Sequence, residues 1–102
     1  MSVPRLGGPR YEADPIAVTL VASAGCHFCE SARQIIENAA ASVPLDVREV
    51  DLESPEGQAL QSQWRAPYPP MVIIDGEMFG YGRISERKLL KHLDGRTDRP
   101  GV

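Results

Sequence analysis

Apolar residues recur along the chain with two different periods, and these periods predict its strands and helices. Residues 16–22 are apolar or β-branched throughout, which is typical of a strand covered on both faces. A helix is predicted from about Cys26 to Ala41, because apolar residues there return at steps of three and four and form one buried stripe. The stripe consists of Cys29, Ala32, Ile35, Ile36, Ala39 and Val43. Pro44 then disfavours helical backbone at the residue before it.

The next segment predicts an edge strand and a short helix. In residues 45–52 apolar and polar positions alternate only at the start, which fits an edge strand better than a central one. Ser54 is the predicted N-cap of a helix with Pro55 at its first position, where a missing N–H does no harm. This helix is expected to end near Trp64.

The last third predicts a hairpin and a final helix. Residues 71–74 form a short apolar run, and the Asp75-Gly76 pair after it is a strong signal for a type I′ turn. Residues 77–79 then start the returning strand, and the glycines in residues 80–82 are expected to loosen it. Ser85 caps the final helix, a staple joins Ile84 to Leu89, and Gly95 stands where a C-terminal glycine cap belongs.

The predicted order of elements is β-α-β-α-β-β-α. A right-handed crossover makes the first two strands parallel, and the hairpin adds two antiparallel strands. We therefore predict an α/β fold, a four-stranded mixed sheet with helices on both faces. The 102 residues allow one such domain, which we assign to residues 15–95, with residues 1–14 as a flexible leader and 96–102 as a flexible tail.

Composition and charge argue against several classes of function. A net charge of −3 gives no basic surface for nucleic acid. The longest apolar run, residues 16–22, is far shorter than a membrane span, and the first ten residues lack the apolar stretch of a secretory signal. Two cysteines three positions apart are not a disulfide framework. We therefore expect a cytoplasmic monomer.

The chemistry is expected at Cys26 and Cys29, where the first strand gives way to the first helix. A thiol at a helix N-terminus faces unpaired N–H groups and the positive end of the dipole, which favour the thiolate. The pKa of a free thiol, ~8.5, can fall to ~3.5–7.5 in such pairs. Cys26 is expected to be exposed and nucleophilic, whereas Cys29 lies on the apolar stripe and would resolve the mixed disulfide. His27, between them, either faces solvent or adds positive charge to the site.

Other uses of the cysteine pair stay open at this point. A structural zinc site needs about four ligands, and only His27 and His92 could join the cysteines. Two chains could each lend their cysteines to a shared iron–sulfur cluster, or the pair could be inert in an interaction domain. We expect neither a metal nor another cofactor in the single chain.

In its motifs the chain resembles glutaredoxin-like proteins of the thioredoxin-fold family. The resemblance rests on Gly25-Cys26-His27-Phe28-Cys29 after an apolar strand, on Pro70 directly before the third strand, and on the glycine-containing turn before the capped last helix. It implies a thiol–disulfide oxidoreductase in which the Pro69–Pro70 bond is cis and faces the cysteine pair. It also implies that the backbone before Pro70 binds the substrate as an extended strand.

The chain departs from the glutaredoxin pattern at several positions. Ser23 stands where a lysine usually binds a carboxylate of glutathione, and Tyr68-Pro69 replaces Thr-Val before the cis proline. Pro69 has no N–H, so one backbone hydrogen bond to the substrate is missing. We therefore expect weak glutathione recognition unless Arg65 or Arg83 compensates.

Several surface side chains are candidate substrate contacts. We assign this role to His27 and Phe28 beside the cysteines, to Tyr68, Pro69 and Pro70 before the third strand, and to Tyr81 after the fourth. Trp64 is expected at the rim of the core. The substrate is expected to be a disulfide-containing protein or a small thiol compound. The reductant stays open between glutathione, another thiol and a reductase.

Overall fold

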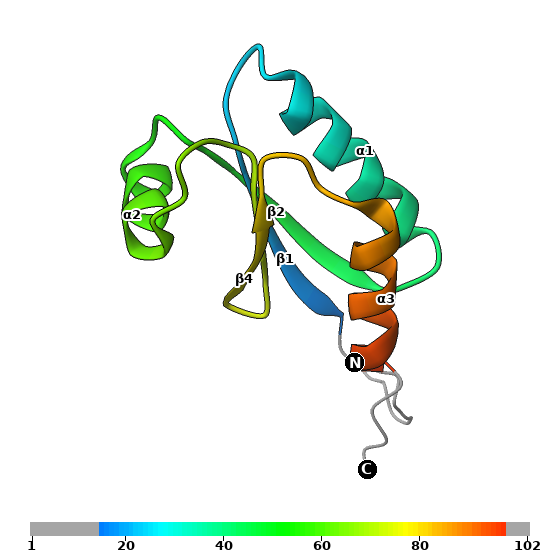
Figure 1. Cartoon of the computed structure of the whole chain (residues 1–102). Helices are drawn as coiled ribbons and strands as arrows, with labels where there is room; N and C mark the ends of the chain where they lie inside the picture. The colour runs from blue at the N-terminus through cyan, green and yellow to red at the C-terminus, as the bar shows by residue number, and fades with distance from the viewer. Residues whose placement is uncertain (1–14, 98–102) are drawn as a thin grey trace, which may run out of the picture.

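A computed structural model describes residues 15–97 (Figure 1). Its elements follow the predicted order: β1 (Ile16–Ala22), α1 (His27–Ala40), β2 (Leu45–Asp51), α2 (Pro55–Trp64), β3 (Met71–Ile74), β4 (Glu77–Tyr81) and α3 (Glu86–Thr97). The expected leader, residues 1–14, and the last part of the expected tail, residues 98–102, lie outside the described residues. The fold class predicted from the sequence is confirmed.

The four strands form one mixed sheet in the order β2-β1-β3-β4. β1 pairs with β2 in parallel and with β3 antiparallel, and β3 pairs antiparallel with β4. β2 is therefore an edge strand, as its weak alternation predicts. The Asp75-Gly76 turn has φ values of 52° and 82°, and two positive φ values are what a type I′ turn requires.

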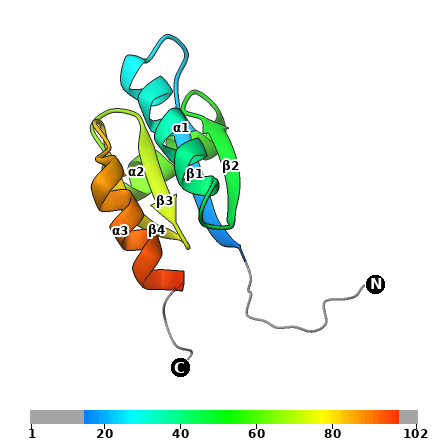
Figure 2. The same cartoon turned by 90° about the vertical axis from the view of Figure 1, so that its right-hand side faces the viewer.

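Helices cover both faces of the sheet. In Figure 1, α1 and α3 lie on one side and α2 on the other; Figure 2, seen from the α1 side, shows α1 and α3 in front of the sheet. Because side chains alternate along a strand, the sheet has a separate core on each face. Val18, Leu20 and Val72 pack with α1 and α3, whereas Val21 and Met71 pack with the second helix.

Two sequence-based expectations about the C-terminal part are wrong. The strand β4 does not loosen at residue 80 but continues to Tyr81, because Gly80 pairs with Val72 and a β-bulge at Phe79 absorbs the irregularity. Gly95 is not a helix cap: α3 continues through it to Thr97, which includes the first residues of the expected tail. The expected caps at Ser54 and Ser85 are confirmed, since each hydroxyl accepts a backbone N–H three residues on.

Candidate redox site

The cysteine pair lies at the end of the central strand, where the chain turns into α1. Gly25 has φ of 71°, a left-handed conformation that favours glycine, and so redirects the chain. Cys26 follows as the N-cap of α1 with extended backbone, and its Sγ accepts a hydrogen bond of 3.1 Å from the Cys29 N–H. The two residues form a disulfide across Cα atoms 5.1 Å apart. The position of the cysteine pair could be predicted from the sequence, because the end of the strand, the turn and the helix cap are all local signals.

The two sulfurs differ in their access to solvent. Cys26 is partly exposed, whereas Cys29 is only 1% exposed and packs with Ala32 and Ile36 in the core beneath α1. Only Cys26 is therefore reachable by a large partner. Among the described residues no charged side chain is buried, so no buried carboxylate lies beside Cys29.

A cis proline lies at the same end of the sheet. The Pro69–Pro70 bond is cis, as the resemblance implies. Met71 pairs with Val21, which places Pro70 level with the end of β1 from which the cysteine loop departs. The Pro70 carbonyl accepts a 2.8 Å hydrogen bond from the N–H of Gly82, so the proline loop is tied to the turn after β4.

Two exposed tyrosines meet beside this proline loop. The rings of Tyr68 and Tyr81 contact each other edge to face, with centroids 5.6 Å apart, although the residues are 54% and 44% exposed. Gly82 leaves room for this arrangement: a Cβ on it would lie 2.7 Å from Cε1 of Tyr68. The pair is thus held in place while most of its surface remains open to a partner.

A groove of about 590 Å³ lies between the first turns of α1 and the β4–α3 loop. It is lined by His27, Phe28, Ser31, Arg83 and Ile84. Phe28 is 50% exposed, which agrees with its expected place on the surface. The structure therefore brings His27 and Phe28 together with Arg83, and it brings Tyr68 together with Tyr81.

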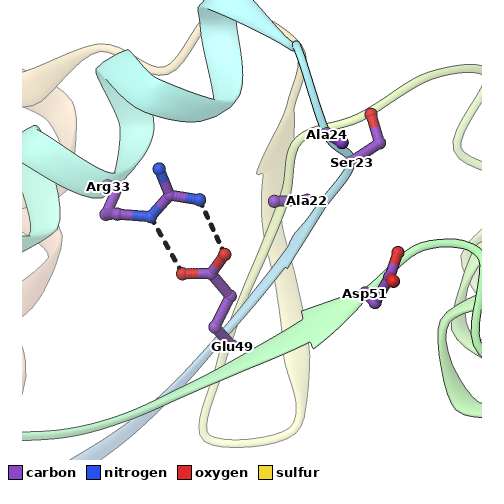
Figure 3. A pocket seen from close by; sticks show the side chains of 6 residues that line it. All are labelled: Ala22, Ser23, Ala24, Arg33, Glu49 and Asp51. Carbon is purple, nitrogen blue, oxygen red and sulfur yellow. Dashed lines mark hydrogen bonds and ion pairs between the residues drawn. The ribbon is translucent and has the colours of Figure 1, made fainter.

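A second cavity, of about 440 Å³, lies between α1 and the β2 edge (Figure 3). Ser23 contributes to it together with Arg33, Glu49 and Asp51. The Arg33 guanidinium donates two hydrogen bonds to Glu49, of 2.9 and 2.6 Å. These bonds lower the pKa of the Glu49 carboxyl and raise the pKa of Arg33. The cation nearest to Ser23 in this cavity is therefore already neutralised.

The sequence could not reveal this second cavity, because Arg33 and Glu49 are brought together only by the packing of α1 on β2.

Trp64 and Arg65, at the end of α2, line neither cavity. Trp64 is half-buried in the core under α2, as expected. Arg65 ends α2 in a left-handed conformation.

Within residues 15–97 no three His, Cys, Asp or Glu side chains lie close enough together to hold a metal ion. In the same part of the chain, no helix is long and apolar enough to cross a membrane.

A dithiol at the start of a helix, after a central strand and level with a cis proline, defines a protein of thioredoxin fold. The chain matches the glutaredoxin family model over residues 18–79 and belongs to the glutaredoxin family. A comparison with curated protein sequences finds no significant match.

Solved structures of similar fold include several thioredoxins. A mutant thioredoxin from Halobacterium salinarum has a TM-score of 0.64 at 22% identity, covering 82% of this chain and 76% of that one. Thioredoxin 1 from Thermosipho africanus has a TM-score of 0.64 at 16% identity, covering 84% of this chain and 99% of that one. A thioredoxin from Thermus thermophilus has a TM-score of 0.55 at 21% identity over 85% and 81%. These likenesses show the fold alone.

Proposed function

We propose that the protein is a thiol–disulfide oxidoreductase in which Cys26 attacks and Cys29 resolves. One observation carries the assignment: the Sγ of Cys26 accepts the N–H of Cys29 at the start of α1, while Cys29 itself is buried. An N–H donated to sulfur stabilises a thiolate more than a thiol, so the accessible sulfur is also the more ionised one.

The reaction consists of two exchanges. The Cys26 thiolate attacks one sulfur of the substrate disulfide, forms a mixed disulfide and releases the other sulfur as a thiolate. The Cys29 thiolate then attacks the Cys26 sulfur and releases the second substrate thiolate. Two electrons pass to the substrate, and the protein is left with the Cys26–Cys29 disulfide. An external dithiol, or two equivalents of a monothiol, restores the reduced pair.

The substrate is proposed to lie across the cis-proline loop. Tyr68 and Tyr81 offer exposed aromatic surface beside this loop, and His27 and Phe28 offer it in the groove at the start of α1. Pro70 presents the loop level with the end of β1. These two surfaces suit a disulfide within a polypeptide as well as a small disulfide. The proposed location is a cytoplasm, whose thiols would keep the pair reduced.

Glutathione is proposed to be a poor reductant. Pro69 lacks an N–H, and the Arg33 cation in the cavity beside Ser23 is held by Glu49. A missing charge-assisted hydrogen bond is worth ~1.5–3 kcal/mol and a neutral one ~0.5–1.5 kcal/mol. Losing both weakens binding by ~30-fold or more, since tenfold corresponds to ~1.4 kcal/mol.

The roles of the two cysteines are tested by substitution and alkylation. Cys26→Ser should abolish disulfide turnover, whereas Cys29→Ser should let a mixed disulfide with the substrate accumulate. In the reduced protein, the rate of alkylation against pH should show Cys26 reacting with an apparent pKa well below ~8.5. Faster alkylation of Cys29, or turnover that persists without Cys26, would contradict the assignment.

The electron donor is tested in a coupled assay on one disulfide substrate. Glutathione with its reductase is compared with a thioredoxin-reductase-type system at equal concentrations of the protein. We expect the second system, or another small thiol, to support faster turnover. Saturation at low millimolar glutathione with efficient turnover would show that another residue supplies the missing binding energy.

A further inference from the structure

The charges on the two sides of the cysteine pair differ in sign. The cavity beside Ser23 contains the carboxylates of Glu49 and Asp51 and a single cation, Arg33, already paired with Glu49. The groove on the α3 side contains the guanidinium of Arg83 and the ring of His27, and none of its lining residues is acidic. A substrate lying across Cys26 therefore meets a negative cavity on one side and a positive groove on the other.

Arg83 differs from the two arginines that stabilise the fold. Arg33 joins α1 to β2 through Glu49, and Arg48 joins β2 to α2 through Glu56, each by two hydrogen bonds. Arg83 is exposed and makes no ion pair with any of residues 15–97. Its guanidinium carries five N–H donors, and the residue lines a groove that begins at the residues between the cysteines.

We propose that Arg83 is a specificity-determining residue that binds an acidic side chain of a polypeptide substrate next to the disulfide under attack. This inference rests on the proposed function, because it assigns the substrate class to the same site. A guanidinium recognises a carboxylate with paired hydrogen bonds. The exposed ring of Phe28 in the same groove gives the neighbouring segment an apolar contact.

A polypeptide fits these surfaces better than a small thiol compound. The proposed contact residues extend from the Tyr68–Tyr81 pair beside the cis-proline loop to the groove at Arg83. The groove alone, about 590 Å³, has the volume that a drug-sized ligand fills, so a small disulfide seated there leaves the tyrosine pair uncovered. An extended chain can contact both surfaces at once.

The test uses three disulfide-linked peptides that differ only in the residue flanking the reacting cysteine, which is Glu, Gln or Lys. For the full chain we expect kcat/KM to fall in this order, by about twofold to fivefold between Glu and Gln. Arg83→Glu should reverse the order and Arg83→Lys should keep it. The preference should shrink at high salt, because the pair is open to solvent.

The ratio between peptides separates recognition from a general effect on the thiol. A change in the pKa of Cys26 alters the rate with all three peptides by the same factor and cancels in the ratio. Arg87→Glu is the matched control: it makes the same change of charge at an exposed position of α3 that does not line the groove, so the order of the peptides should stay.

Each outcome decides between explanations. The proposal would be overturned if the ratio of kcat/KM between the Glu and Gln peptides were the same for the unchanged protein and for Arg83→Glu. It would also be overturned if Arg87→Glu changed this ratio as much as Arg83→Glu does. A preference shown only for a small carboxylated disulfide, and not for the peptides, would overturn the choice of a polypeptide. Failure to reduce even the Gln peptide would instead count against the oxidoreductase itself.

Discussion

Replacing Gly57 by alanine is expected to destabilise the protein, although the residue lies in a helix. Gly57 is buried in the first turn of α2, against the end of β2. A Cβ there would lie 2.7 Å from the Cα of Leu52, 2.8 Å from its carbonyl oxygen, and closer still to the carbonyl oxygen of Asp51. All three are backbone atoms, so no side-chain rotation can relieve the contact and α2 has to move away from the sheet.

The magnitude follows from two opposing terms. Alanine is favoured over glycine in a helix by ~1 kcal/mol. Overpacking costs ~1–3 kcal/mol, and contact with rigid backbone argues for the upper end of that range. Gly57→Ala should therefore lower the free energy of unfolding by ~2 kcal/mol, which corresponds to a fall in Tm of ~8–16 °C for a domain of this size.

Gly95→Ala is the matched control, because it makes the same substitution in α3 at a site with no atom within 4 Å of the new Cβ. It should raise the free energy of unfolding by up to ~1 kcal/mol. The assay is equilibrium unfolding in urea, followed by far-UV circular dichroism, with the midpoints of both variants compared at equal slope. If Gly57→Ala stabilises the protein as much as Gly95→Ala does, the close approach of α2 to β2 is wrong.

Three further predictions concern the surroundings of the cysteines. Ser23→Lys should raise glutathione-coupled turnover by about threefold or more, because it adds one ion pair to a carboxylate of glutathione. Ser23→Gln is the neutral control. If turnover does not rise, Pro69 or the reductant itself sets the specificity. Gly82→Ala should lower the free energy of unfolding by ~1–3 kcal/mol, because the φ of 73° disfavours alanine and the new Cβ displaces the Tyr68 ring. In a double-mutant cycle with Tyr68→Ala, ~0.5–1.5 kcal/mol of this loss should appear as coupling energy between the two residues. A coupling energy of zero would assign the whole loss to the backbone conformation. Glu49→Gln should lower the free energy of unfolding by at most ~1 kcal/mol at neutral pH. Arg33 lowers the pKa of Glu49 in the folded state. The difference in unfolding free energy between the two proteins should therefore be present above pH ~4.3, the usual pKa of Glu, and vanish as the pH falls through the lowered pKa of the folded state. A difference that persists in acid would contradict the ion pair as its cause.

Most of the fold could be predicted because its signals are local. The bounds of β1 and β3, and the start of α2 at its Ser54-Pro55 cap, follow from apolar runs and capping residues that do not depend on distant partners. The end of β4 could not be predicted in this way. Gly80 is a poor strand residue on its own, and it stays in the sheet because Val72 pairs with it across a bulge.

The candidate site also has a part that local signals predict and a part that they do not. Cys26 and Cys29 were predictable, with their difference in burial, because a strand end, a turn and a helical stripe lie within a dozen residues. The two cavities beside them were not predictable. Arg33 pairs with Glu49, and Ser31 and Arg83 come to line one groove, only after the strands have paired in register and the helices have packed on the sheet. The sequence by itself thus determined the position of the cysteine pair and the difference in burial between its two sulfurs, and the tertiary structure decided which charged side chains lie beside it.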